Sequence, residues 1–362
     1  MNRIKTLWAI GCALFCAVCA SAKLVVTKTL CNYQTEPMAI VEENTKIRVG
    51  WQYEDSEGIQ PVIQDCYELV IDGRITDTPV FHSGLVLSAE SQFIELPTLP
   101  YLPSGYQWRV RIGKDGEWSD WSQPQTIRVV PSDLTSNLSP ANTPRWIGAI
   151  TKADARIPGG RWSNTDFKKD TFKTKWDAVD TLSMKSIIVR KAFTPRRQVV
   201  DAMVYVCGLG HYELYINGQK VGDSEFAPLW SEYSKTVYFN AFDITKMLQE
   251  PSGTREPSRA SRTSKTSKTS KSSRTSKSSR TSKTRKTSKS QDLNTLSVLL
   301  GNGFFNVQRG GRYSKLQTSF GPPQLLLRLD LCYDDGTTES IVSDESWRWT
   351  PSPITFNSIY GG

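Results

Sequence analysis

The chain has 362 residues, which at about 100 to 200 residues per domain is enough for two or three folded units. Its 45 Lys and Arg residues outnumber its 36 Asp and Glu residues, and the resulting net charge of +9 would suit nucleic acid or a membrane surface as a partner. The distribution of the charge argues against both, because twelve of the basic residues lie between Ser258 and Ser290. Without them and the basic residues Arg3 and Lys5, the chain is mildly acidic.

The first 22 residues have the pattern of a secretory signal peptide. Basic residues at positions 3 and 5 precede an apolar run from Leu7 to Val18, and small residues follow at Ala20 to Ala22. We therefore predict that the mature chain is exported to the periplasm or beyond the cell. The apolar run is shorter than the roughly 20 residues that span a bilayer, and no later segment is long enough, so we expect no membrane span.

Few side chains of the types that bind metals remain after the predicted signal peptide. Four widely spaced cysteines in a chain of this length do not predict a disulfide framework, and whether Cys207 pairs with Cys332 stays open. With only two histidines in the sequence, a Cys/His zinc site is not expected. We expect neither a metal nor a cofactor. The residues concerned are Cys31, Cys66, Cys207, Cys332, His82 and His211.

Residues 23–130 are predicted to form a first β-sandwich. Short alternating runs at residues 46–51, 67–71 and 106–112 are separated by Gly, Asp, Ser and Pro, which is typical of antiparallel strands in a domain of about 100 residues. The layout resembles a fibronectin type III module, including the sequence Trp-Ser-Asp-Trp-Ser at residues 118–122.

The two tryptophans of this motif follow a strand in which Arg109 and Arg111 share one face. This spacing predicts that indole rings and guanidinium groups interleave as cation–π pairs, each worth about 0.5 to 1 kcal/mol when exposed. We interpret the arrangement as stiffening of the domain rather than as a ligand site.

Residues 131–185 are rich in Pro, Ser, Thr, Asn and Asp and are predicted to be a linker with one brief strand at residues 146–150. Residues 186–362 have a second set of alternating apolar runs and no sustained helical periodicity, which predicts a second sandwich of the jelly-roll type. Asn217-Gly218 is a strong hairpin signal within it. The fold class is therefore all-β. The expected strands lie at 186–193, 202–206, 212–216, 236–239, 295–300, 324–331 and 341–342.

A basic repeat, residues 251–291, interrupts the second sandwich. Thr-Ser-Lys recurs there with almost no apolar residue to bury, so the segment cannot offset its own ordering entropy and is predicted to be disordered. Three interpretations stay open: a solvated neutral insertion, an electrostatic tether to an anionic polymer or envelope, and a nucleic-acid binder. Specific nucleic-acid binding is the least supported, because the repeat has no aromatic side chain on which bases stack.

The second sandwich contains a series of motifs at residues 190–194, 206–223, 228–233, 299–305, 321–327, 343–347 and 353–362. In their sequence and order these motifs resemble the N-terminal accessory region of bacterial α-L-rhamnosidases. This resemblance implies an inverting hydrolysis of terminal α-L-rhamnose, which needs two carboxyl groups about 6.5 to 9.5 Å apart. It also implies that both carboxyl groups belong to a helical (α/α)6 barrel that follows the accessory domains.

The sequence contains no pattern of such a barrel, so we assign no catalytic residue. We interpret the chain as the non-catalytic N-terminal portion of an exported α-L-rhamnosidase, truncated before the barrel, with a rhamnose-containing glycan and the barrel as its partners. Two alternatives remain. The chain could be a stand-alone carbohydrate-binding protein, or a surface adhesive protein that uses the basic repeat.

Trp230 and Tyr233 are the candidate carbohydrate-binding residues, since sugar recognition combines an aromatic face with polar groups; packing in the core is the alternative. His211 follows a Gly-Leu-Gly run and is expected to fill a turn. Local carboxylates are expected to be solvated or to cap turns rather than to transfer protons. These carboxylates are Glu213, Asp223, Glu232 and Asp243.

Overall fold

The computed structural model describes residues 24–35, 37–56, 62–130, 134, 143–149, 160–162, 185–249, 293–306, 317–319, 321–355, 357 and 359, with the backbone alone at 160–162 and 317–319. The predicted signal peptide, most of the predicted linker and the basic repeat lie outside these ranges. Contacts between Cα atoms divide the chain into two units, Met1–Val130 and Pro131–Gly362.

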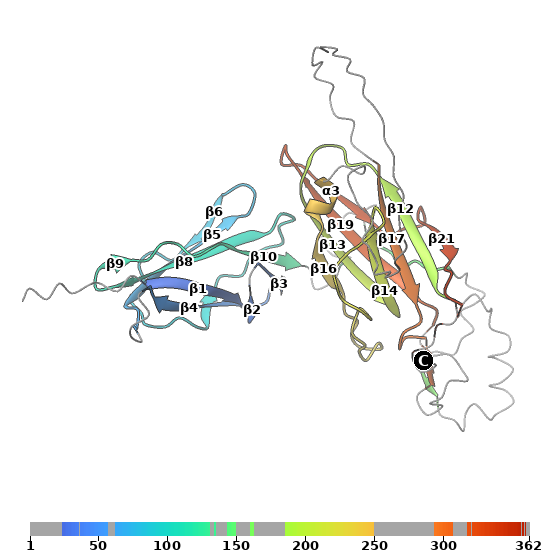
Figure 1. Ribbon diagram of the computed structural model, residues 1–362, viewed down its shortest axis with the longest axis horizontal. Helices are drawn as coiled ribbons and strands as arrows, with labels where there is room; N and C mark the ends of the chain where they lie inside the picture. Colours follow the sequence, from blue (N-terminus) through green and yellow to red (C-terminus); the bar gives the residue numbers. More distant parts are fainter. Residues whose placement is uncertain are drawn as a thin grey trace, which may run out of the picture. The chain divides into compact units, whose positions relative to one another are not determined.

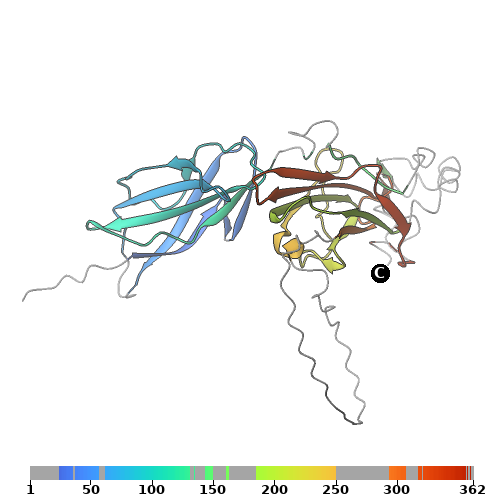
Figure 2. The same cartoon turned by 90° about the horizontal axis from the view of Figure 1, so that it is seen from above.

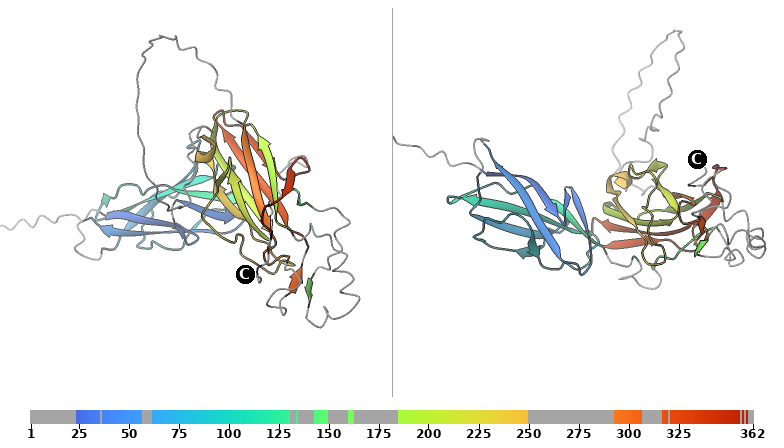
Figure 3. Two further views of the ribbon diagram at one scale, coloured as in Figure 1. Left: turned by 45° about the vertical axis from the view of Figure 1, so that its right-hand side comes forward. Right: turned by 90° about the horizontal axis from the view of Figure 1, so that it is seen from below.

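The all-β prediction is confirmed. Strands make up nearly all of the coloured ribbon in Figure 1, Figure 2 and Figure 3, and the helix α3, Thr245–Gln249, is a short turn beside strand β13. None of the helical structure in the described ranges has the length and apolar character needed to cross a lipid bilayer.

The first unit is a sandwich of two sheets, seen in Figure 1 as a layer with β1 and β4 and a layer with β5 and β8. One sheet has the order β2-β1-β4-β7, and the other has the order β3-β10-β8-β5-β6, with β9 added beside β8. Strand β3 runs parallel to β10, whereas the other pairs are antiparallel. The strands are β1 Leu24–Cys31, β2 Gln34–Thr35, β3 Met38–Glu42, β4 Ile47–Asp55, β5 Cys66–Gly73, β6 Pro79–His82, β7 Ile94–Leu96, β8 Tyr106–Lys114, β9 Glu117–Trp118 and β10 Gln125–Val130.

Two buried tryptophans anchor the core of this unit. Trp51 in β4 and Trp108 in β8 are almost wholly buried. The Trp51 indole donates to the Gln64 side chain over 2.8 Å, and the Trp108 indole donates to Gln125 over 2.9 Å. Because the polar atom of each ring has a partner, the rings contribute their apolar area without leaving an unsatisfied donor inside the sandwich.

The predicted interleaving of arginine and tryptophan is confirmed. The Arg111 guanidinium lies 4.7 Å from the centre of the Trp118 ring and 4.9 Å from that of Trp121, and Arg109 lies 5.3 Å from Trp121. Arg111 Nε also donates to the Glu68 carboxylate over 2.6 Å. These arginines are occupied by contacts within the domain, as expected for a stiffening element.

The second unit is also a sandwich. A five-stranded sheet has the order β15-β14-β17-β12-β21, a four-stranded sheet has the order β16-β13-β19-β20, and β11 and β18 form a separate pair. The strands are β11 Gly160–Trp162, β12 Ile187–Phe193, β13 Val199–Leu209, β14 His211–Ile216, β15 Gln219–Lys220, β16 Asn240–Asp243, β17 Asn294–Gly301, β18 Gln317–Ser319, β19 Gln324–Tyr333, β20 Thr338–Val342 and β21 Arg348–Pro351.

Aliphatic side chains from both sheets fill the core of this sandwich. Val189, Leu214 and Val298 from the five-stranded sheet lie in one buried cluster with Val204 and Leu327 from the four-stranded sheet. Nearly every residue of β13 and β19 is buried, so these two central strands are covered on both faces.

Three local predictions can be compared with the strands directly. The hairpin at Asn217-Gly218 is confirmed, since both residues have a left-handed φ, of 50° and 82°, between β14 and β15. The strand predicted at residues 236–239 is wrong: β16 begins at Asn240, because residues 240–243 are the ones that pair with β13. The strand predicted at 146–150 is reduced to one bridge between Ile147 and Leu325.

The cysteines at positions 31, 66, 207 and 332 are free thiols. Burial raises the pKa of Cys31 and of Cys207 to about 12, so neither is an activated nucleophile. In the part of the chain that the structure describes, no group of three or more His, Cys, Asp or Glu side chains is placed to hold a metal ion.

Candidate glycan-binding site

At one end of the second sandwich, two glycines let two backbone segments approach closely, and these segments form the candidate site. Gly210 lies between β13 and β14 with φ at 118°, and a Cβ there would lie 2.0 Å from the carbonyl oxygen of Gly301. Gly303 has φ at 52°, and a Cβ there would lie 2.7 Å from the His211 ring. Only glycine fits both places, and the close approach brings the start of β14 against the turn that follows β17.

Four aromatic rings gather around this turn, and we call them the aromatic cluster: His211, Phe226, Trp230 and Phe304. The His211 ring centre lies 5.5 Å from that of Phe226 and 6.2 Å from that of Phe304. The Trp230 ring lies 5.9 Å from Phe304. The cluster therefore joins β14, the loop after β15 and the turn after β17.

The outer part of the cluster faces solvent. Phe226 is 69% exposed and Trp230 is 63% exposed, although both are large apolar side chains. Phe226 has φ at 56°, a backbone conformation that is unfavourable for a bulky residue. Exposed rings on a backbone held in this way offer flat apolar surfaces, which stack well on the C–H faces of sugars.

Trp230 and Tyr233, the two predicted site residues, have different environments. The Tyr233 ring packs edge-on against Phe305 at 5.2 Å, and burial, with Cys207 nearby, raises the pKa of its hydroxyl to about 12. Trp230 stands out into solvent beside Phe304. Trp230 therefore remains the candidate for sugar stacking, whereas Tyr233 has the surroundings of a packing residue.

Among the predicted carboxylates, Glu213 accepts a hydrogen bond from the Tyr215 hydroxyl at 2.6 Å and pairs with Lys220 at 3.2 Å, and both interactions lower its pKa. Glu232 accepts a hydrogen bond from Ser234 at 2.9 Å. The Tyr215 and Lys220 contacts favour the anionic form of Glu213, which is opposite to what a proton donor needs.

The other two carboxylates lie at the end of β16 and on the loop after β15. Asp243 accepts the Thr245 backbone N–H at 2.9 Å and caps the start of α3. Asp223 is exposed on the loop after β15. The prediction that these carboxylates are solvated or cap turns agrees with the surroundings of Asp223, Glu232 and Asp243. Glu213 differs, since it is half-buried within β14 and paired with Lys220.

His211 fills the turn as predicted. Its ring lies between Phe226 and Phe304, and burial lowers the pKa of its imidazole, which is therefore neutral at neutral pH. Sequence reasoning missed Phe226 and Phe304 as members of the site. For Phe304 a signal was available in the adjacent Gly303, whose left-handed φ of 52° marks a tight turn.

Comparison with known proteins places both units in one family. Residues 197–255 and 284–362 match the α-L-rhamnosidase N-terminal domain, and residues 26–131 match the Rha78A-like N-terminal immunoglobulin domain. The chain belongs to the α-L-rhamnosidase family, and it corresponds to the N-terminal region of these proteins. The match to the α-L-rhamnosidase domain passes over residues 256–283, which lie in the basic repeat. The first unit, predicted to be fibronectin type III-like, matches an immunoglobulin domain, and the two domain types share the sandwich architecture.

Individual α-L-rhamnosidases support this assignment. An α-L-rhamnosidase of Formosa agariphila is 27% identical over 97% of this chain, and the chain covers 32% of that relative. The solved α-L-rhamnosidase of Dictyoglomus thermophilum matches the fold over 94% of this chain and 31% of its own, with a TM-score of 0.60 and 20% identity. That of Streptomyces avermitilis, solved with L-rhamnose, matches over 91% and 41%, with a TM-score of 0.55 and 19% identity. The chain thus spans about a third of the length of this Formosa agariphila relative.

Proposed function

We propose that this chain is the exported, non-catalytic N-terminal region of an enzyme that removes terminal α-L-rhamnose from glycans, and that its second sandwich holds the glycan. The family assignment supports the link to rhamnose. The single observation that supports glycan contact is the exposed Trp230 ring, set against Phe304 on the glycine-shaped turn.

The chemistry of the described carboxylates fits a binding role better than a catalytic one. An inverting hydrolase needs one carboxyl group that stays protonated near neutral pH and a second that activates water. Glu213, the most enclosed of the predicted carboxylates, is held as an anion by Tyr215 and Lys220. We therefore expect the isolated chain to release no rhamnose from an aryl α-L-rhamnoside, and measurable turnover would contradict this proposal.

Calorimetric titration of the full chain tests the binding role. The probe is an oligosaccharide that ends in α-L-rhamnose, and its control is the same oligosaccharide without the terminal rhamnose. We expect Trp230→Ala to weaken binding of the probe about five- to ten-fold, since a stacked ring contributes roughly 1 kcal/mol beyond its buried area.

Two matched variants make the result specific. Leu229→Ala removes a neighbouring apolar side chain that is 78% exposed, and Tyr233→Phe removes a half-buried hydroxyl. Both are expected to keep the affinity of the original chain. Equal affinity of Trp230→Ala and the original chain, or loss of binding in all three variants alike, would refute the proposed role of Trp230.

A further inference from the structure

A small pocket of the first unit lies on the outward face of the sheet that contains β1 and β4, and it has a volume of about 130 Å³. Gly50 alternates along β4 with two residues of the core, so Gly50 and its partner in β1 face away from the core. The missing side chain lets the loop before β7 approach closely, since a Cβ on Gly50 would lie 3.1 Å from the Ser91 carbonyl oxygen. We call this hollow the β1–β4 pocket, and its lining includes Leu30, Tyr33, Gly50, Gln52, Gln92 and Phe93.

Two aromatic rings border the β1–β4 pocket, and both stand on backbone positions that favour glycine. Asn32 and Tyr33 form the two-residue turn between β1 and β2, with φ at 45° and 65°. A hairpin turn with left-handed φ at both positions usually has the sequence Asn-Gly. Phe93, just before β7, also has a left-handed φ, of 59°. The Tyr33 and Phe93 ring centres lie 6.1 Å apart, so the two rings border one space.

Packing within the protein does not explain why bulky rings occupy these positions. The left-handed region is sterically unfavourable for a residue with a large side chain. Burial of the ring would offset this strain, but Tyr33 is 76% exposed and Phe93 is 58% exposed. Strained backbone of this kind is concentrated at positions that contact ligands. The two rings are therefore better explained as a binding surface than as part of the core.

The polar groups of the β1–β4 pocket suit a neutral ligand with hydroxyl groups. Among the described residues, none forms a hydrogen bond with the side-chain amides of Gln52 and Gln92 or with the Tyr33 hydroxyl. Of the described residues that line the pocket, only Arg48 is charged, and its guanidinium is paired with the Glu95 carboxylate at 3.1 Å. An amide has two donors and one acceptor, which complement hydroxyl groups that both donate and accept.

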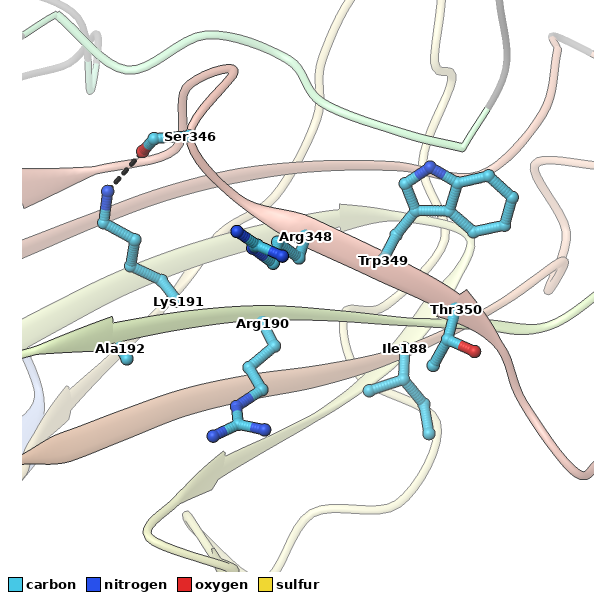
Figure 4. Close-up of a pocket in the computed structure, with 8 residues that line it drawn as sticks. All are labelled: Ile188, Arg190, Lys191, Ala192, Ser346, Arg348, Trp349 and Thr350. Atoms are coloured by element: carbon cyan, nitrogen blue, oxygen red, sulfur yellow. Dashed lines mark hydrogen bonds between the residues drawn. The ribbon is translucent and has the colours of Figure 1, made fainter.

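The larger groove between β12 and β21 of the second unit lacks such convergence. Figure 4 shows the Arg190 guanidinium directed away from β21, and Lys191 donates to the Ser346 hydroxyl. Trp349 pairs with the buried Val189, so its side chain projects from the opposite face of the sheet to Arg190. The polar and aromatic groups of that groove therefore face different ways, whereas those of the β1–β4 pocket surround one space.

We propose that the β1–β4 pocket binds one neutral pyranose ring, with Tyr33 and Phe93 against its C–H faces and the amides of Gln52 and Gln92 on its hydroxyl groups. Aromatic rings supply flat apolar surface for such contacts. The pocket is smaller than the roughly 300 to 1,000 Å³ of sites for drug-sized ligands, which limits the occupant to a single sugar ring. The inference goes beyond the proposed function, because it gives the first unit a sugar site of its own.

Saturation-transfer NMR with the full chain tests this inference. The chain carries Trp230→Ala, which removes the candidate stacking residue of the second sandwich. The probes are the methyl pyranosides of L-rhamnose, D-glucose, D-galactose, D-mannose and D-xylose, all of them neutral. We expect saturation transfer to at least one of these sugars. Gln52→Ala should weaken binding of that sugar about five-fold, as expected for loss of a hydrogen bond.

Glycine variants separate binding from folding. Tyr33→Gly and Phe93→Gly each remove a ring and introduce the residue that the left-handed φ favours. Each should weaken binding of the sugar about five- to ten-fold without lowering the midpoint of thermal unfolding. Two controls change exposed side chains of the same unit outside the pocket: Leu87→Ala removes an apolar side chain that is 80% exposed, and Gln123→Ala removes an amide. Both controls should keep the affinity.

Absence of saturation transfer to all five sugars would overturn the inference, and so would equal effects of the pocket and control substitutions. A fall of several degrees in the unfolding midpoint of either glycine variant would show that the ring packs within the fold, which also contradicts a binding role. The test of the proposed function is separate, because it measures whether the terminal-rhamnose oligosaccharide depends on Trp230. The β1–β4 pocket is assayed in a chain that already lacks the Trp230 ring, so either proposal can fail while the other holds.

Discussion

Arginines on outward-facing strand positions have different surroundings in the two sandwiches. In the first unit Arg111 lies between Trp118 and Trp121 and pairs with the Glu68 carboxylate. In the second unit Arg190 and Arg348 lie opposite one another, and no described carboxylate pairs with them. The same type of side chain therefore packs within one domain and is exposed without such contacts in the other.

This comparison predicts that replacing an arginine lowers the free energy of unfolding much more in the first unit than in the second. Arg111→Ala loses two cation–π contacts and leaves Glu68 enclosed without its main partner, so we expect the free energy of unfolding to fall by about 2 to 3 kcal/mol. Arg190→Ala should change it by less than about 0.5 kcal/mol, as for most surface substitutions. Denaturant unfolding of both variants measures the contrast, and equal losses would mean that the two arginines have similar roles.

A smaller effect is expected from pH. Burial acts to raise the pKa of Glu68, but the hydrogen bonds from Arg111 and His82 outweigh it, and the net pKa lies below the ordinary 4.5. Because the folded-state pKa is the lower one, Glu68 stabilises the fold at pH above 4.5 and loses this contribution as the pH falls through its folded-state pKa.

Thermal unfolding of the original chain and of Glu68→Gln between pH 6 and pH 3 measures this contribution. The original chain should lose more stability across that interval than the variant does, because glutamine does not titrate. Parallel loss of stability in the two proteins would show that other groups control the acid response.

The smallest effect is expected from the basic repeat, compared with the sandwich that carries it. Deleting residues 258–290 removes twelve positive charges and almost no apolar side chain, so the unfolding midpoint of the second unit should stay unchanged within the error of a melting experiment. A drop of several degrees would show that the repeat makes packed contacts.

Local features of the fold could be predicted from the sequence, because neighbouring residues determine them. Asn217-Gly218 specifies a tight hairpin wherever it joins two alternating runs, and the alternation of Arg109 and Arg111 places both on one face of β8. The strand at 240–243 was misplaced by four residues, because its register depends on pairing with β13 rather than on its own pattern.

The sites were less predictable, because residues distant in the sequence form them. Trp230 could be chosen as an aromatic residue near polar groups, but its neighbour Phe304 comes from the far side of the basic repeat. Arg190 and Arg348 lie opposite one another only because β21 returns to the edge of the sheet beside β12. No local pattern around either arginine indicates that the other lies opposite.

A crystal structure of the full chain with an oligosaccharide ending in α-L-rhamnose tests the central claim, glycan binding by the second sandwich, most directly. The account predicts electron density for the terminal sugar over the exposed face of the Trp230 ring. Density for the sugar elsewhere with the Trp230 ring bare, or no bound sugar at concentrations that saturate the calorimetric titration, would contradict it.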